Sequence, residues 1–211
     1  MKTTTIFNKT HRLQITLILA GLISLASLPA TAQNAWPTGE EKGSVTLVKG
    51  KNTTFRCKIN TNAMKRKRFF IKNTSFGNPM EGRKEHSNRY DEYSVVKLVS
   101  HDSVINAIRK SFPGGRLAEL VAADEEFSLS IYIDEQGEVI SLNYSLEFGT
   151  SILPTEIEGL EKNLLNALEF TIEGKRFDSP TVYSAYIVVK FPEVEQGEIR
   201  ILRNLELQGI L

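Results

Sequence analysis

The chain has 211 residues, of which 41% are hydrophobic and 24% charged, and its formal net charge is +1. This composition is typical of a globular domain, and it excludes an intrinsically disordered chain and a protein embedded in the membrane. The single cysteine excludes an intramolecular disulfide, so the folded state must be stabilised by packing alone.

The first 32 residues have the three-part layout of a secretory signal peptide. Three basic residues and no acidic one precede a mostly apolar run over 13–28, and residues 29–32 offer small side chains at a cleavage site. A retained membrane anchor is the alternative, but the apolar run is shorter than the roughly 20 residues that span a bilayer. We therefore expect cleavage after Ala32 and an exported, soluble protein, periplasmic or secreted, with no transmembrane segment left.

The mature chain carries opposite charge in its two halves. Residues 42–100 contain 14 Lys or Arg against 4 Asp or Glu, whereas residues 101–211 contain 9 against 19. The two halves can attract each other within the fold, or the basic half can be a binding surface for an anionic partner such as an acidic glycan. The candidates for partner binding are Lys65, Arg66, Lys67, Arg68 and Phe69. A nucleic-acid partner is not expected, because no nucleic-acid-binding fold is recognisable.

A loose leader over 33–43 is expected to precede a basic part, 44–100, that is rich in β-strands. Strands are predicted over 44–49, 53–59, 68–72 and 93–99. In the second of them Phe55, Cys57 and Ile59 alternate with polar residues, which makes Cys57 a core thiol rather than a nucleophile. Residues 74–92 are polar and long for a structureless connection. Trp36, in the leader, either folds back on the domain, which we favour, or anchors a partner.

A helix is predicted next, with Asp102 as its N-cap and an apolar stripe that ends near Phe112. Residues 113–115, Pro-Gly-Gly, end this helix, and a short helical turn is expected over 117–122. These elements open the α+β part of the chain, 101–211.

The most regular segment, 126–191, predicts a β-β-α-β unit. Two strands, 126–133 and 138–146, alternate apolar and polar residues around a hairpin turn in which Gly137 suits a positive φ. Thr155 and Glu158 are interpreted as the capping box of an amphipathic helix. Gly174 and Pro180 mark an exit loop, a long strand over 182–191 closes the unit, and the tail 197–211 adds one more strand through Ile199 and Ile201.

This unit resembles the C-terminal domain of TonB and its stand-alone relatives in bacterial envelopes. The resemblance is carried by FSLSIYIDEQGEVISLNYSL, LPTEIEGLEKNLLNALEF and TVYSAYIVVKF, and the whole chain also looks like secreted proteins of the Bacteroidetes. The TonB resemblance implies binding of an extended partner segment by strand addition at an open sheet edge. A cleaved signal leaves no membrane anchor, and there is no long Pro-rich spacer, so neither energy coupling nor any binding residue is carried over.

No catalytic motif is recognisable in the sequence. After the signal peptide there are two histidines, His86 and His101, and a pair with Cys57 would require that the thiol leave the core. Two isolated histidines and one buried thiol do not supply the ligands of a zinc site, so no metal, cofactor or catalytic residue is expected. Paired carboxylates stay open as an alternative, because Asp and Glu are abundant.

Together these patterns predict an α+β fold, an antiparallel sheet with two main helices packed on it, in which 44–100 and 101–211 form one continuous domain. The expected function is non-catalytic binding of a peptide, a glycan or an envelope protein through a sheet edge or the basic 49–72 face. The alternatives are a secreted hydrolase with paired carboxylates and a structural surface component. A deep cleft with two convergent carboxylates favours the hydrolase, and a basic surface without them favours binding.

Overall fold

The computed structural model describes residues 35–38, 43–61, 65–85, 94–174 and 180–202. The expected signal peptide, His86 and the tail after residue 202 lie outside the described residues. Within those ranges, no helix is long and apolar enough to cross a membrane. The elements below all belong to one compact unit, Asn34–Leu211.

A mostly antiparallel sheet forms the centre of this unit, with strands in the order β1-β2-β3-β7-β6-β9-β10. The strands are β1 (Val45–Lys49), β2 (Thr54–Thr61), β3 (Lys67–Asn73), β6 (Glu126–Ile133), β7 (Val139–Glu147), β9 (Thr181–Lys190) and β10 (Arg200–Leu202). The short β4 (Lys84–Glu85) pairs in parallel with the start of β9. A separate ribbon pairs β5 (Ser94–Leu98) with β8 (Phe170–Gly174). Since β3 pairs with β7, the basic and acidic halves of the chain contribute to one sheet.

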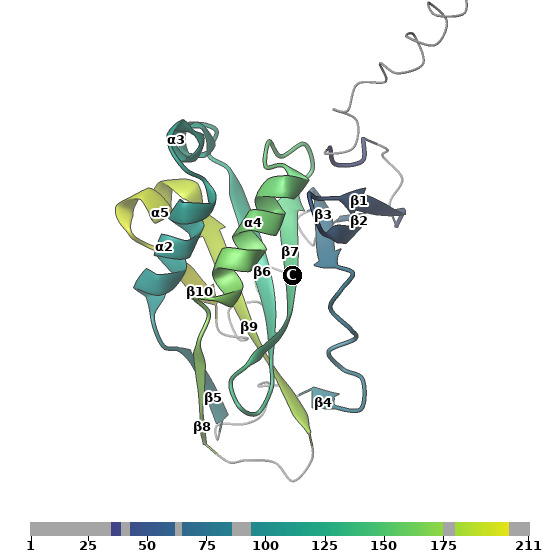
Figure 1. Cartoon of the computed structure of the whole chain (residues 1–211), viewed down its shortest axis with the longest axis vertical. Coiled ribbons are helices and arrows are strands. Elements are labelled where there is room, and N and C mark those ends of the chain that lie inside the picture. Colours follow the sequence, from purple (N-terminus) through teal and green to yellow (C-terminus); the bar gives the residue numbers. More distant parts are fainter. Residues whose placement is uncertain (1–34, 39–42, 62–64, 86–93, 175–179, 203–211) are drawn as a thin grey trace, which may run out of the picture. The chain divides into compact units, whose positions relative to one another are not determined.

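The helices of the described residues lie on one face of this sheet (Figure 1). The helices of the described part are α2 (His101–Ser111), α3 (Gly115–Ala122), α4 (Pro154–Leu165) and α5 (Phe191–Gln196). Buried apolar side chains of α4, such as Ile157, Leu160 and Leu164, face the sheet, and α2 packs beside α4. The predicted α+β class, with an antiparallel sheet and helices packed on it, is confirmed.

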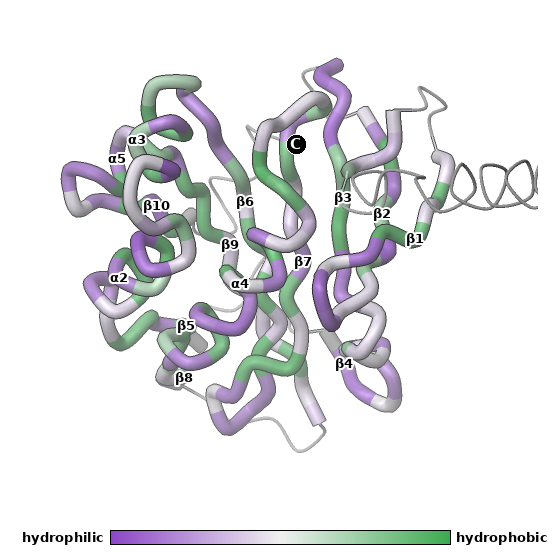
Figure 2. The backbone as a smooth tube through the Cα atoms, turned by 45° about the horizontal axis from the view of Figure 1, so that its top comes forward, coloured by the Kyte–Doolittle hydropathy of each residue, from purple (hydrophilic) through white to green (hydrophobic). Residues whose placement is uncertain are grey.

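Strand alternation divides the side chains between the two faces of the sheet. On β6, Phe127, Leu129, Ile131 and Ile133 are all fully buried under the helices. Hydrophobic stretches run along β6 and β9 at the centre of the fold, whereas outer loops are hydrophilic (Figure 2). Cys57 on β2 joins this core, as predicted, and burial raises the pKa of its thiol to about 12. The intervening residues of each strand therefore point to the opposite face, on which no helix of the described ranges lies.

The leader packs on the domain through Trp36, which is only 9% exposed. Its indole Nε1–H donates to the carbonyl oxygen of Ile152 at 2.5 Å, and its ring stacks on Phe69 with centroids 5.8 Å apart. Folding back on the domain, the interpretation that we favoured for Trp36, is confirmed.

Both predicted helix starts were wrong. Ser100 caps α2, because its Oγ accepts a hydrogen bond from the backbone N–H of Ser103 at 3.1 Å, so Asp102 lies inside the first turn. Glu156, and not Glu158, closes the first turn of α4 by accepting from the N–H of Leu153 at 2.8 Å. Polar residues are frequent around both helix starts, and the apolar periodicity of a helix does not identify which of these neighbouring residues is its N-cap.

The region after α4 also differs from the prediction. Phe170–Gly174, which includes the start of the expected exit loop, forms β8 and pairs with β5, so the predicted β-β-α-β unit contains an additional strand. The closing strand β9 ends at Lys190, where α5 begins. The strand expected in the tail is present as β10.

Candidate functional site: the open face of the sheet

The sheet face opposite the helices, called the open face below, contains a cavity of about 700 Å³. Side chains from six strands line it. The side chains of the lining that point to this face or its rim are those of Arg56, Lys58, Arg66, Arg68, Phe70, Lys72, Glu126, Ser128, Ser130, Tyr132, Asn143, Ser145, Tyr186, Val188, Lys190 and Arg200. The open face is therefore assembled from both the basic and the acidic half of the sequence.

Strand register arranges these side chains in rows across the sheet. The central row runs from β2 to β10 through Lys58, Phe70, Ser145, Ser128, Val188 and Arg200. Neighbouring strands lie about 4.8 Å apart, so the backbones at the two ends of this row are separated by roughly 24 Å. Each row of the open face is thus long enough to contact several consecutive units of a chain-like ligand.

Positive charge dominates the open face. Seven Lys or Arg side chains line the cavity, against the single carboxylate of Glu126 among the described residues. In the part of the chain that the structure describes, Arg56, Lys58 and Lys190 have no carboxylate within ion-pair distance. Like charges that line one cavity focus a positive potential, which concentrates anions there.

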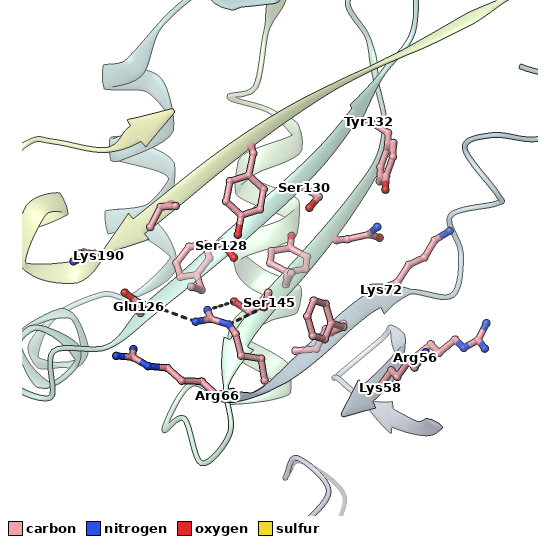
Figure 3. Close-up of a pocket in the computed structure, with 18 of the residues that line it drawn as sticks. Arg56, Lys58, Arg66, Lys72, Glu126, Ser128, Ser130, Tyr132, Ser145 and Lys190 are labelled. Atoms are coloured by element: carbon pink, nitrogen blue, oxygen red, sulfur yellow. Dashed lines mark hydrogen bonds and ion pairs between the residues drawn. The ribbon is translucent and has the colours of Figure 1, made fainter. Parts of the chain in front are cut away.

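Arg68 is a fixed charge on the floor of the cavity, because its side chain is only 10% exposed. Its Nη1 lies 3.1 Å from Oε1 of Glu126. Its Nε and Nη2 donate to the hydroxyl and the carbonyl oxygen of Ser145 at 2.9 and 3.0 Å (Figure 3). These bonds hold the guanidinium in one position, whereas Arg56 and Lys58 are exposed and can adapt to a ligand.

Neutral polar groups occupy the middle of the open face. Ser128 and Ser130 lie between the cations of β2 and β3 and Lys190 of β9 (Figure 3). Within the described ranges, the hydroxyls of Ser128, Ser130 and Tyr186 and the side-chain amide of Asn143 have no protein hydrogen-bond partner. Hydroxyl and amide groups both donate and accept, so this zone can bind a ligand that does the same.

The structure divides the candidate run Lys65–Phe69 between the two faces. Lys65 and Arg66 are exposed just before β3, and Arg66 lines the cavity. Lys67 lies over the ring of Phe148, with its Nζ 5.5 Å from the centroid, while Arg68 belongs to the open face. Phe69 is 2% exposed in the core and is unavailable to a partner at the surface. Its neighbour Phe70 is 40% exposed on the open face instead.

Of the other cations of the open face, Arg56, Lys58 and Lys72 lie within the basic 49–72 face that the sequence predicted, whereas Lys190 and Arg200 were missed. The alternation in β2 that predicts Phe55, Cys57 and Ile59 in the core also directs Arg56 and Lys58 to the opposite face, so a signal for these two was present. Lys190 and Arg200 have no such signal, because they reach the cavity only through the pairing of β9 with β6 and β10.

A second cavity, of about 540 Å³, lies between the β1–β2 turn and α4, and two carboxylates line it. Burial alone would raise the pKa of Glu158, but hydrogen bonds from Asn52, Lys51 and Thr53 outweigh it and hold the pKa below its usual value. Burial raises the pKa of Glu161, although a hydrogen bond from Asn73 opposes this. Two neighbouring carboxylates whose pKa values shift in opposite directions are a feature of acid–base catalytic sites.

The bonding of these two carboxylates nevertheless indicates a structural role. Both oxygens of Glu158 accept hydrogen bonds from the turn at residues 52–53. Glu161 is 5% exposed, one of its oxygens is bonded to Asn73, and the other is buried. The carboxylate of Glu158 is thus committed to the β1–β2 turn, and that of Glu161 is bonded to Asn73 and largely buried. Within the described ranges, moreover, no three His, Cys, Asp or Glu side chains are grouped as metal ligands.

Comparisons with known proteins add little to this geometry. No protein-family model matches the chain, and no curated protein matches it either. A solved structure of a DUF5043 family protein from Bacteroides uniformis is similar, with 11% sequence identity and a TM-score of 0.48 over 71% of this chain and 86% of that one.

Proposed function

We propose that this protein is a non-catalytic binding protein that takes up an anionic partner on the open face of its sheet. The observation that carries the proposal is that, among the described residues, seven Lys and Arg side chains and a single carboxylate line the 700 Å³ cavity. Ion pairs within the fold leave Arg56, Lys58 and Lys190 unneutralised in the described part of the chain. An anion therefore gains attraction there without displacing an existing partner.

The composition of the open face argues against the paired-carboxylate hydrolase. Such an enzyme needs two carboxylates on opposite sides of the scissile bond. The cavity is lined by Glu126 alone among the described acidic residues, and Arg68 already binds it. Binding is the chemistry that the remaining side chains support.

Export belongs to the same proposal. The signal-like residues 1–32 place the mature protein beyond the cytoplasm, in the periplasm or outside the cell, where anionic partners of the cell envelope are within reach. A salt-sensitive interaction with such a partner follows from the exposed position of the cations.

The resemblance to the C-terminal domain of TonB supports a second mode of binding, strand addition at a sheet edge. The strand β1 lies at the edge of the sheet, and its side chains Val45 and Leu47 are 46% and 66% exposed. A partner bound there would be held by backbone hydrogen bonds and apolar contacts, so its affinity would change little with salt. Salt dependence therefore distinguishes this mode from binding on the open face.

Charge reversal at Arg56 and Lys58 tests the proposal. We expect wild-type protein to bind immobilised polygalacturonate or polyglutamate, and the double variant Arg56→Glu/Lys58→Glu to bind about ten-fold more weakly or worse. Wild-type binding should weaken between about 0.1 and 1 M salt, because the Debye length falls from about 10 Å to about 3 Å. Surface plasmon resonance at both salt concentrations measures both effects.

The matched control is Lys110→Glu/Lys162→Glu, which reverses two exposed lysines on α2 and α4, on the helical side of the sheet. It changes the net charge by the same amount and should lose far less affinity. Equal losses in both double variants would mean that only net charge matters, and failure of the wild type to bind either polyanion would refute the proposal outright.

A further inference from the structure

We infer that the anionic partner of the open face is an acidic glycan, a chain of sugars bearing carboxylates, that lies across the strands from β2 towards β10. This inference rests on the proposed function and names the class of ligand. It follows from the order of charged and neutral groups along the rows, from their hydrogen-bonding capacity and from the pairing of the strands beneath them.

Charges on the open face lie towards its two sides, with neutral groups between them. In the central row, Lys58 on β2 and Arg200 on β10, which is ion-paired with Glu193 at 2.6 Å, lie at the two ends, while Ser145 and Ser128 lie between them. The neighbouring row, two residues along the strands, begins with the cations Arg56 and Lys72 and continues through Asn143, Ser130 and Tyr186. A ligand whose polar groups are all charged would place charges over serines and an amide. A ligand with hydroxyls between its carboxylates matches both zones.

Hydrogen-bonding capacity points to the same class of ligand. Lys and Arg side chains only donate, and ionised carboxylates or phosphates only accept. The unpartnered hydroxyls of Ser128, Ser130 and Tyr186 and the amide of Asn143, by contrast, can donate and accept. Sugar hydroxyls also do both, so they can satisfy these groups, whereas a plain polyanion leaves their acceptor oxygens without a donor.

Aromatic side chains accompany the polar groups. Tyr132 and Tyr186 line the cavity, and Phe70 is 40% exposed in its central row. An aromatic ring presents a flat apolar surface, and the hydroxyl of tyrosine adds a polar group at its end. Sugar rings have apolar C–H faces and polar rims, so they can pack on these rings while their hydroxyls reach the serines.

The backbone beneath the cavity disfavours a peptide ligand. Extended peptides gain much of their affinity from main-chain hydrogen bonds to an open sheet edge. On the open face, however, β3, β7, β6 and β9 are each paired on both sides. A peptide lying there could bond only to side chains, because the backbone groups of these strands are already paired. Its own N–H and C=O groups would then compete for the few hydroxyls. A glycan has no such row of backbone groups to satisfy.

The test compares three probes of matched length. They are oligogalacturonate, the neutral oligosaccharide obtained when each of its carboxylates is reduced to a hydroxymethyl group, and oligoglutamate. Titration calorimetry should show oligogalacturonate binding about ten-fold or more tightly than either other probe. The variant Ser128→Ala/Ser130→Ala keeps every charge, and it should weaken oligogalacturonate by roughly five-fold or more while leaving oligoglutamate unchanged. Circular dichroism verifies that the variant is folded.

The outcomes separate this inference from the proposed function. If oligoglutamate binds as tightly as oligogalacturonate, or if the serine variant weakens both equally, the glycan is refuted while anion binding stands. If the neutral oligosaccharide binds as well as the acidic one, or if no probe binds, anion binding on the open face is refuted together with the inference.

Discussion

Replacing Gly137 with alanine is expected to lower the free energy of unfolding by about 2–5 kcal/mol. Gly137 lies in the β6–β7 turn with φ +89°, a left-handed conformation that costs other residues energy. A Cβ at this position would lie 2.3 Å from the carbonyl oxygen of Phe170 on β8, which is backbone and cannot swing away. The turn and β8 must therefore move apart.

For a domain of this size, thermal unfolding followed by circular dichroism should show the midpoint of Gly137→Ala lower by roughly 4–20 °C. Gly149→Ala is the matched control, because Gly149 has φ +87° but nothing within 4 Å of the added Cβ. The free energy of unfolding of that variant should fall only by the cost of placing alanine at a positive φ, about 1–2 kcal/mol. Equal losses for the two variants would contradict the close approach of β8 to the turn.

Replacing Trp36 with alanine is expected to cost about 3–5 kcal/mol, although the residue lies in the leader outside the sheet. The indole is 9% exposed, stacks on Phe69 and donates to Ile152 at 2.5 Å. Truncation leaves a cavity over Phe69 and an unsatisfied carbonyl group. Urea unfolding should be followed by circular dichroism, because Trp36 is the only tryptophan and its fluorescence is lost with it.

Trp36→Phe separates packing from hydrogen bonding. It keeps an aromatic ring over Phe69 and removes the donor, so a smaller loss of about 1 kcal/mol is expected from the missing hydrogen bond. If Trp36→Ala unfolds at the same urea concentration as the wild type, the leader does not contribute to the folded domain.

The hairpin of β6 and β7 could be predicted from sequence because its information is local. Apolar side chains alternate along both strands, and the Oδ1 of Asp134 accepts hydrogen bonds from the N–H groups of Gln136 and Glu138, at 3.0 and 2.9 Å. The turn therefore stabilises itself, with Gly137 supplying the positive φ. Neither feature depends on a distant segment.

The strand β8 could not be predicted in the same way. It has five residues, and its partner β5 lies far away in the sequence. Its apolar residues Phe170 and Ile172 follow the amphipathic helix without a break, so they look like the end of that helix or the start of a loop. Its position is determined by the ribbon with β5 and by the turn at Gly137, which are tertiary contacts.

The candidate site was predictable only in part. Phe69 and Arg68 are adjacent in the basic run, yet strand alternation sends Phe69 to the core and Arg68 to the cavity. Assigning one face to the whole run was therefore the physical error. Lys190 and Arg200 come from the acidic half, where overall charge pointed away from a basic surface. Only the order of strands in the sheet brings them to the cavity.

Amide chemical-shift mapping of the protein with oligogalacturonate would locate the bound glycan on the fold. The largest shifts are expected on β2, β3, β6, β7 and β9, around Lys58, Ser128 and Lys190, whereas α2 and α4 should change little. Shifts concentrated on the outer edge of β1, or around Glu158 and Glu161 at the second cavity, would contradict binding on the open face.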